Sequence, residues 1–370
     1  MNGPDLSGGR VLGIVYGHVA DTMASVPSFR SLRHAFPSAR LDALVVRASA
    51  PVLRDCPYID EVMRWDDFQL KGTRFARPEK AATIAMLGLR LRRRRYDAVL
   101  VFHRSFRIIR KIATLSGAPI RAGVSAGADG YTHWRPAPGQ VHSSQDENRA
   151  VLAAVGVDED GGPLEIWPSS MDEAAAGELV GPATGAPLIG LHPGSDWSCQ
   201  QWLPERWAAV ARGLRDQMDA RLLITGSGAE SDLAGEIAGR SDGAARSIAG
   251  RTSLTGLAAV IRRLDLLITV NSAPAAIAQA VGTPAVVLVG PEDPRLTGLV
   301  SGRRLGVVRS TSEAAPGSWC EFGRWGVLSG CDSPVCVGVG GLDRIEVEDV
   351  IKAANHMPRS AMPRELEVAL

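Results

Sequence analysis

The sequence predicts an α/β fold with two doubly wound parallel sheets. Apolar runs rich in β-branched residues alternate with helical patterns along most of the chain, and repeated βα units form parallel sheets that helices cover on both faces. A passage rich in glycine, proline and acidic residues at 156–172 interrupts this alternation. The 370 residues also exceed the usual size of a single hydrophobic core. We therefore expect two domains that face each other across a cleft.

In the first half of the chain, strand and helix patterns follow one another in order. Short apolar runs predict strands, and longer segments with helical periodicity predict helices. The expected strands are 11–16, 39–46 and 98–102, and the expected helices are 22–35, 80–94 and 106–115.

The same alternation resumes in the second half. The expected strands are 188–191, 221–225, 266–270 and 285–289, and the expected helices are 204–216, 230–238, 254–263, 273–280 and a terminal helix at 347–355. Gly161-Gly162-Pro163 and Gly181-Pro182 mark a hinge between the halves. We assign an N-terminal domain to 1–172, a linker to 173–187, a second domain to 188–346 and a C-terminal helix to 347–370.

Composition excludes several classes of partner. The chain carries 41 basic and 40 acidic residues and a net charge of +1, which argues against general nucleic-acid binding. No run of about 18 apolar residues is present to cross a membrane, and residues 1–10 do not resemble a signal peptide. We expect a cytoplasmic protein with a small-molecule partner, at most peripheral membrane contact and an oligomeric state that the sequence leaves open.

Five scattered cysteines fit reduced thiols better than a disulfide framework. Cys320, Cys331 and Cys336 form the one group with a resemblance to a zinc site, but their spacing differs from that of a zinc knuckle and no histidine lies nearby. We therefore expect no metal.

Three glycine-containing turns follow apolar strand patterns in the second half. They are His192-Pro193-Gly194-Ser195, Thr225-Gly226-Ser227-Gly228 and Val289-Gly290-Pro291-Glu292-Asp293-Pro294. Each precedes a helical pattern, so backbone N–H groups at helix starts can face bound phosphate. Turns at the ends of successive strands meet in one crevice of a parallel sheet, which predicts a nucleotide-diphosphate site.

Further motifs occur along the chain in a defined order. They are Ala20-Asp21-Thr22-Met23-Ala24-Ser25-Val26-Pro27, Arg104-Ser105, Arg121-Ala122-Gly123, Trp202-Leu203-Pro204-Glu205-Arg206-Trp207, Gly226-Ser227-Gly228-Ala229-Glu230 and Thr252-Ser253-Leu254. With the three turns, this set resembles the heptosyltransferase family, the GT-B enzymes that add heptose from ADP-heptose to the lipopolysaccharide inner core. The resemblance covers most of the chain. It implies two Rossmann-like domains facing a central cleft, with the acceptor bound by the first and the nucleotide sugar by the second.

Two single positions and one six-residue segment depart from the family pattern. Gln200 stands where the family has a phosphate-contacting lysine, and Ala20 replaces a loop glycine. Asn271-Ser272-Ala273-Pro274-Ala275-Ala276 stands where the family has Asp-(Ser/Thr)-Gly-Pro-Met-His. The leaving diphosphate must then be stabilised by Ser195, Ser272 and the amides of the following helix, with Arg206 or Arg251 as the candidate replacement cation.

The resemblance implies that Asp21 is the catalytic base of an inverting glycosyl transfer. A carboxylate with an ordinary pKa of about 3.9 can accept the acceptor proton late, as the new C–O bond forms. The alternative interpretation of Asp21 is a helix N-cap. His18 and Arg104 are the candidate acceptor-binding residues.

Eight residues are expected to bind the donor: Ser195, Gln200, Gly226, Glu230, Thr252, Asn271, Ser272 and Ala273. The resemblance implies that Glu230 contacts the ribose hydroxyls and that Thr252 lines the base pocket. Helix-start roles are the alternatives for both. His192 is expected to make local hydrogen bonds, and Arg92-Arg93-Arg94-Arg95 to end a helix or to form a basic rim that attracts an anionic substrate.

The resulting prediction is a metal-independent, cofactor-free glycosyltransferase whose co-substrate is a nucleotide sugar, with ADP-heptose as the expected donor. The acceptor is either lipopolysaccharide core or a soluble natural product such as an aminocyclitol intermediate of antibiotic biosynthesis. Gln200, Asn271 and Ala276 motivate a second hypothesis, a non-catalytic nucleotide-sugar-binding relative. A sugar-nucleotide epimerase or hydrolase on the same fold is the third.

Overall fold

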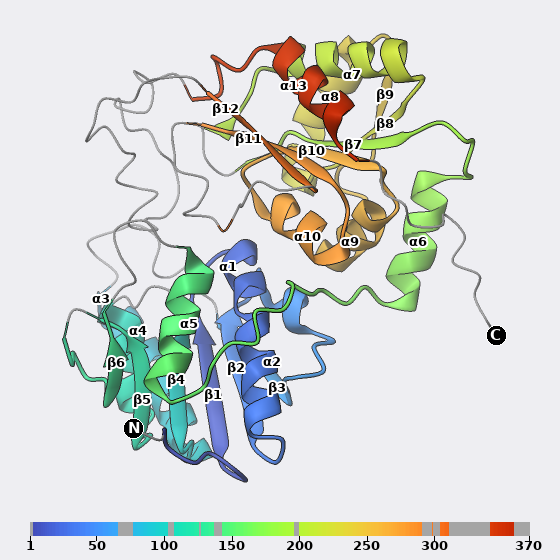
Figure 1. Cartoon of the computed structure of the whole chain (residues 1–370). Coiled ribbons are helices and arrows are strands. Elements are labelled where there is room, and N and C mark those ends of the chain that lie inside the picture. The colour runs from blue at the N-terminus through green and yellow to red at the C-terminus, as the bar shows by residue number, and fades with distance from the viewer. Residues whose placement is uncertain are drawn as a thin grey trace. The chain divides into compact units, whose positions relative to one another are not determined.

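The computed structural model describes residues 3–65, 77–102, 107–125, 127–136, 143–195, 200–290, 298, 304–310 and 341–358. The chain divides into two compact units, Met1–Trp167 with Arg295–Gly298 and Pro168–Pro294 with Leu299–Leu370. Each unit is built on one six-stranded sheet (Figure 1). Every strand pair is parallel, as the repeated βα units predict.

The sheet of the first unit has the order β3-β2-β1-β4-β5-β6. Its strands are β1 (Arg10–Val15), β2 (Arg40–Val46), β3 (Glu61–Trp65), β4 (Ala98–Phe102), β5 (Ile120–Val124) and β6 (His133–Arg135). The chain winds outward from β1 to β3 and then returns to the other side of β1 for β4. The connections after β1 and β4 therefore lead in opposite directions, which opens a crevice beyond the carboxyl ends of these two strands.

Helices cover both faces of this sheet. They are α1 (Val19–Ala24), α2 (Val26–Ala35), the 3-10 helix η1 (Ala50–Leu53), α3 (Arg77–Arg94), α4 (Arg107–Leu115) and α5 (Ser144–Ala154). Leu12 and Ile14 of β1 belong to one core cluster with residues of α3 and α4. Gly13 lies against the Phe29 ring of α2, which packs edge-on against Phe102. This alternation places successive β1 residues on opposite sheet faces.

The helix expected at 22–35 is two helices, because Pro27 starts a new one. Pro27 occupies the first turn of α2, where its missing N–H leaves no hydrogen bond unmade. Ser25 lies between the two helices and donates its hydroxyl to Thr22 O at 2.7 Å. The break leaves α1 as a separate six-residue helix directly after β1.

The second unit repeats the winding with the order β12-β11-β10-β7-β8-β9. Its strands are β7 (Leu188–His192), β8 (Arg221–Ile224), β9 (Ala245–Ser247), β10 (Leu266–Val270), β11 (Ala285–Val289) and β12 (Leu305–Arg309). Here the direction of winding changes between β7 and β10. The expected crevice thus lies beyond His192 and Val270.

The helices of the second unit are α6 (Ser170–Val180), α7 (Pro204–Met218), the 3-10 helix η4 (Gly228–Glu230), α8 (Ser231–Arg240), α9 (Leu254–Arg262), α10 (Ala273–Val281) and α13 (Val347–His356). α7, α8 and α13 cover one face of the sheet, and α9 and α10 cover the other (Figure 1). α13 confirms the helix expected at 347–355 and packs on α7, where Ile351 fills the space above Gly213. It ends at His356, and residues 359–370 of the C-terminal helix assigned to 347–370 lie outside the described residues.

The linker expected at 173–187 is mostly helix. Ser169 caps α6, since it accepts from Asp172 N at 3.1 Å and donates to the Asp172 carboxylate at 2.7 Å. Glu173 accepts from Arg262 of α9 at 2.9 Å, which fixes α6 to the second unit. The boundary between units therefore lies between Trp167 and Pro168, and the expectation that the first domain extends to residue 172 is wrong.

The residues that precede this boundary are fixed on α2 of the first unit by Arg30. The buried Arg30 guanidinium donates to Asp160 at 2.8 Å and to Pro163 O at 3.0 Å. Its hydrogen bond holds the pKa of Asp160 at about 2. The stretch from 157 to 167 is therefore part of the first unit rather than a loose connection.

Among the described residues, no helix has both the length and the apolar character that a bilayer crossing requires. The cytoplasmic location stays a prediction.

Candidate active site

Asp21 lies at the carboxyl edge of the first sheet, beside the change in winding direction. β1 ends at Val15, and three residues later His18 is the N-cap of α1. Asp21 is the third residue of this helix and is partly buried. The residue predicted to be the base thus stands at the position where doubly wound sheets bind their ligands.

Both carboxylate oxygens of Asp21 accept hydrogen bonds. Oδ2 accepts from His18 N at 2.9 Å, and Oδ1 accepts from the Ser144 hydroxyl at 2.7 Å. The predicted N-cap role is wrong in its detail, because His18 is the N-cap and Asp21 closes the capping box from the third helical position. A Cβ on Gly17 would lie 2.5 Å from Asp21 Oδ2, so glycine is required there for the carboxylate to approach the backbone.

Helix α5 holds α1 through two residues that sequence reasoning missed. Ser144 binds the Asp21 carboxylate, and Asn148 Nδ2 donates to Ala24 O at 3.0 Å. The two residues are four apart and therefore share one face of α5. The signal in the sequence is the capping box of Ser143 and Asp146, which starts α5 at this place.

One of the two predicted acceptor-binding residues lies in the described part of the chain. His18 is exposed beside Asp21, whereas Arg104 lies outside the described residues, as do 103–106 as a whole. Acceptor binding stays a prediction for both.

Arg92–Arg95 lie at the end of α3 and away from Asp21, so a basic rim at the candidate site gains no support. α3 runs back along the sheet after β3, so these arginines lie just before β4 begins, at the amino edge. Asp21 lies at the carboxyl edge. Arg94 donates to Glu61 at 2.7 Å, and the run ends a helix, as the alternative interpretation predicted.

All eight predicted donor-binding residues follow the carboxyl ends of strands in the second sheet. Because parallel strands present these ends at one edge, the residues share that edge. Ser195 and Gln200 follow β7, Gly226 and Glu230 follow β8, Thr252 follows β9, and Asn271, Ser272 and Ala273 follow β10.

Glu230 is held between the loops that follow β7 and β8. Its Oε2 accepts from Ser227 N at 2.6 Å. Its carboxylate also lies so close to Gly194 that a Cβ there would be 1.8 Å from Oε1. The Gly226 backbone passes beside the Glu230 Cβ as well, since a Cβ on Gly226 would be 3.2 Å from it. The two glycine turns therefore form the seat of this carboxylate.

Ser195 and Gln200 form one hydrogen-bonded pair in the loop after β7. The Ser195 hydroxyl donates to Gln200 Oε1 at 2.8 Å, and both side chains are partly buried. The loop thus brings two predicted donor-binding residues together. Each can hydrogen-bond a phosphate oxygen, but neither supplies a positive charge.

Helix α10 begins beside the same crevice. Asn271 is buried at the end of β10, and its N–H donates to Leu288 O at 3.1 Å. Ser272 is the extended N-cap residue, and its hydroxyl faces Val270 O at 3.4 Å. Ala273 is the first helical residue. The positive end of the α10 dipole therefore faces this edge of the sheet.

The two candidate replacement cations have different surroundings. Arg206 donates to Asp343 O at 2.8 Å and lies 6.0 Å from the centre of the Trp202 ring, so it fixes the chain before α13. Arg251 is exposed in the loop after β9, beside Thr252. Ser253, and not Thr252, caps α9, because its hydroxyl accepts from Gly256 N at 2.9 Å. Thr252 is partly buried at the carboxyl edge of the second sheet.

His192 makes the local hydrogen bond that the sequence predicted. Its Nδ1 lies 2.9 Å from the Thr225 hydroxyl, between the ends of β7 and β8. Burial lowers the pKa of His192 to about 4, and the Glu230 charge opposes this shift. A buried neutral imidazole connects the two loops that hold Glu230.

Because His192 is buried and neutral, we expect the stability of the second unit to fall in acid. The unfolded chain binds a proton at His192 below about pH 6.5, whereas the folded chain resists it until about pH 4, so stability falls as the pH falls through this window. Between pH 7 and pH 5 the wild type should lose about 2 kcal/mol more than His192→Asn, which keeps a side chain able to bond Thr225. Urea unfolding at both pH values measures this, with His18→Asn as the exposed control. An unchanged pH slope in His192→Asn would contradict the prediction.

Metal independence stays a prediction. Among the described residues, no three His, Cys, Asp or Glu side chains form a group that could hold a metal ion. Cys199, Cys320, Cys331 and Cys336 lie outside the described residues, as does Pro291–Pro294 of the third glycine turn. Cys56 is buried, and burial raises the pKa of its thiol to about 12.

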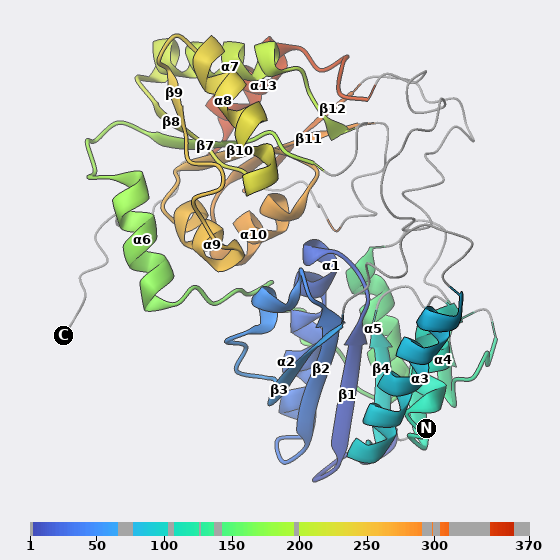
Figure 2. The same ribbon diagram turned by 180° about the vertical axis from the view of Figure 1, so that it is seen from behind.

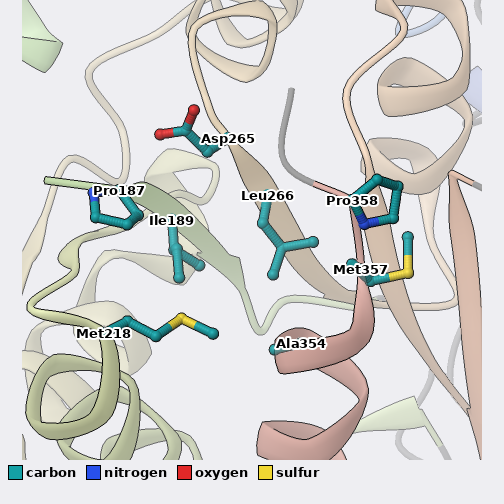
Figure 3. Close-up of a pocket in the computed structure, with 8 residues that line it drawn as sticks. All are labelled: Pro187, Ile189, Met218, Asp265, Leu266, Ala354, Met357 and Pro358. Atoms are coloured by element: carbon teal, nitrogen blue, oxygen red, sulfur yellow. The ribbon is translucent and has the colours of Figure 1, made fainter. Parts of the chain in front are cut away.

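A small cavity lies at the opposite edge of the second sheet (Figure 3). Pro187 and Asp265, which precede β7 and β10, line it together with Met357. Its volume of about 10 Å³ suits a single water molecule at most. This cavity is therefore not a nucleotide site.

A sequence model described as glycosyltransferase family 9 (heptosyltransferase) matches residues 84–318. The chain belongs to glycosyltransferase family 9. The match spans the second half of the first unit and most of the second, including all eight predicted donor-binding residues.

Curated relatives of this glycosyltransferase are lipopolysaccharide heptosyltransferases. It is 26% identical to lipopolysaccharide heptosyltransferase 3 of Escherichia coli over 285 residues, which is 74% of this chain and 81% of the relative. It is 23% identical to lipopolysaccharide heptosyltransferase 2 of E. coli K12 over 321 residues, 78% of this chain and 84% of the relative.

Solved structures share the fold. A glycosyltransferase family 9 protein from Veillonella parvula superposes with a TM-score of 0.77 at 22% identity, over 96% of this chain and 98% of that one. An E. coli heptosyltransferase solved with ADP gives a TM-score of 0.69 at 17% identity, over 94% and 99% of the two chains. The α/β GT-B fold and the family resemblance are thus confirmed. The roles of individual residues stay predictions.

Proposed function

We propose that this glycosyltransferase transfers heptose, with inversion, from ADP-heptose to a hydroxyl group of the lipopolysaccharide core. The observation that carries the proposal is the edge of the second sheet, where Glu230 is seated between two glycine turns beside the start of α10. A carboxylate that accepts from vicinal ribose hydroxyls and a helix start that faces a diphosphate suit a nucleoside diphosphate. The names of the curated relatives support heptose and lipopolysaccharide.

In the proposed reaction, Asp21 takes the proton of the acceptor hydroxyl while its oxygen attacks the anomeric carbon. The bond from that carbon to the β-phosphate oxygen breaks on the opposite side, so ADP leaves and the configuration inverts. No metal or cofactor is part of the proposal. The hydrogen bonds from His18 N and Ser144 keep the Asp21 carboxylate oriented before it accepts the proton.

The leaving diphosphate gains negative charge in a site without the family lysine. Ser195, Gln200 and the α10 amides supply hydrogen bonds and a partial positive charge. Arg251 is the cation that we assign to this edge, because Arg206 is engaged with the backbone before α13. Loss of one charged contact of this kind commonly costs roughly 10² in rate.

A thermal-shift panel with ADP, UDP, GDP and dTDP at millimolar concentration tests the donor. A ligand at 100 times its Kd adds roughly 2.7 kcal/mol of stability, so ADP should give the largest shift. Glu230→Ala should remove that shift, whereas Glu236→Ala on the exposed side of α8 is the matched control. A preference for another nucleotide would contradict ADP-heptose, and no shift with any of them would favour a non-catalytic relative without nucleotide binding.

Transfer assays with ADP-heptose then separate the remaining functions. Heptose should appear on a truncated lipopolysaccharide core and not on aminocyclitols. The soluble acceptor class is the second candidate, since Gln200, Asn271 and Ala276 alter the donor edge. Free sugar or an epimer that forms without any acceptor would contradict transfer and favour the hydrolase or epimerase.

A further inference from the structure

Helix α3 presents large apolar side chains on the side that faces away from its sheet. Met86 is 65% exposed and Leu89 is 51% exposed. The inner side of the same helix packs against the first unit, since Leu91 is buried in the core and Gly88 lies against Leu115 of α4. A helix that only covers a sheet needs one apolar face, and no residue of the first unit that the structure describes accounts for the apolar side chains on the outer face of α3.

The exposed apolar residues continue into a row of cations. Leu89 and Arg90 are three and four residues after Met86, and Arg93 is four and three residues after them, so the four side chains share one face of the helix. Arg90 and Arg93 are both exposed. From residue 82 to residue 95 the chain has five arginines and no acidic residue.

Helix α4 extends this basic surface. It packs alongside α3 (Figure 2) and contributes exposed Arg107 and Lys111, again without an acidic residue from 107 to 115. The charge is local, because the net charge of the whole chain is only +1. The surface of α3 and α4 thus has a composition unlike the average of the protein.

We propose that the outer face of α3, with the cations of α4, docks on an anionic lipid surface. Apolar side chains beside arginines on an interfacial helix insert below the headgroups while the cations bind anionic lipids. A nucleic acid would match the cations but would gain little from Met86 and Leu89. The docking surface does not include Asp21 or the donor edge, and so goes beyond the proposed function.

Vesicle binding by the full chain tests this docking surface. The probes are vesicles of phosphatidylglycerol with phosphatidylcholine, and vesicles of phosphatidylcholine alone, both without glycolipid. We expect at least tenfold stronger binding to the anionic vesicles, with a loss of affinity as salt rises. Equal binding to both, or none to either, would overturn the proposal.

Two double variants separate the apolar and the charged contributions. Met86→Ser with Leu89→Ser, and Arg90→Gln with Arg93→Gln, should each weaken anionic-vesicle binding about tenfold or more. Met171→Ser, which changes an 80% exposed methionine on α6, and Arg54→Gln, at a 45% exposed arginine, should leave it unchanged. If only the arginine variant weakens binding, the surface is a polyanion site and not a lipid-docking face. Since no donor or acceptor is present, the outcome is independent of glycosyl transfer.

Discussion

Asp21→Asn should lower kcat for sugar transfer by about 10³ while the fold and nucleotide binding persist. General base catalysis contributes roughly 10²–10⁴ in rate, and an amide cannot take the acceptor proton. Asparagine has the same shape and can still accept from His18 N through its carbonyl oxygen, so the start of α1 is preserved. Steady-state kinetics and the ADP thermal shift measure the two effects separately.

Ser144→Ala provides the graded comparison. It removes the 2.7 Å hydrogen bond to Asp21 Oδ1 but leaves the carboxylate in place. A hydrogen bond to a charged group contributes about 1.5–3 kcal/mol, so kcat should fall about tenfold or somewhat more. Asp216→Asn, at a carboxylate exposed on α7, is the control that should keep full activity. If Asp21→Asn retains more than a tenth of the wild-type kcat, Asp21 only closes the capping box of α1.

The pattern of apolar runs was sufficient for the central strands. The strands expected at 98–102, 266–270 and 285–289 have the bounds of β4, β10 and β11, because buried parallel strands form continuous apolar runs. The edge strands were missed, and so was the inner strand β5, which lies between β4 and β6. β3 and β9 contain charged residues at positions that face solvent, and this breaks the apolar run by which a central strand is recognised.

Two helices were missed because the capping boxes at their starts follow residues that are typical of loops. Ser143 with Asp146 and Ser169 with Asp172 are capping boxes that begin α5 and α6. Both follow stretches rich in glycine and proline, where no helical pattern was expected. The failure to predict α5 affects the candidate site, because α5 carries Ser144.

The candidate site was likewise predicted only in part. Its location at the strand ends followed from the sequence, since parallel strands bring their carboxyl ends to one edge. Contacts between residues distant in sequence did not follow. Ser144 is 123 positions from Asp21, and nothing local to Gly194 indicates that the Glu230 carboxylate lies against it.

Gly194→Ala should therefore raise the donor KM by about 10–100-fold through Glu230. The Gly194 backbone is outside the left-handed region, so alanine causes no backbone strain. Its Cβ would instead lie 1.8 Å from Glu230 Oε1, which forces the carboxylate out of its seat. Ser227 N then loses its partner, and the lost capping box costs about 1 kcal/mol of stability.

A double-variant cycle identifies the cause of this effect. In Glu230→Ala the clashing carboxylate is absent, so adding Gly194→Ala should change the donor KM less than twofold. Gly235→Ala on α8, where a Cβ meets no atom within 4 Å, is the matched control and should keep the wild-type KM. If Gly194→Ala is equally harmful with and without Glu230, the β7 loop itself binds the donor and Glu230 does not. A wild-type KM in the single variant would mean that the carboxylate can leave its seat without loss, and that the ribose is held elsewhere.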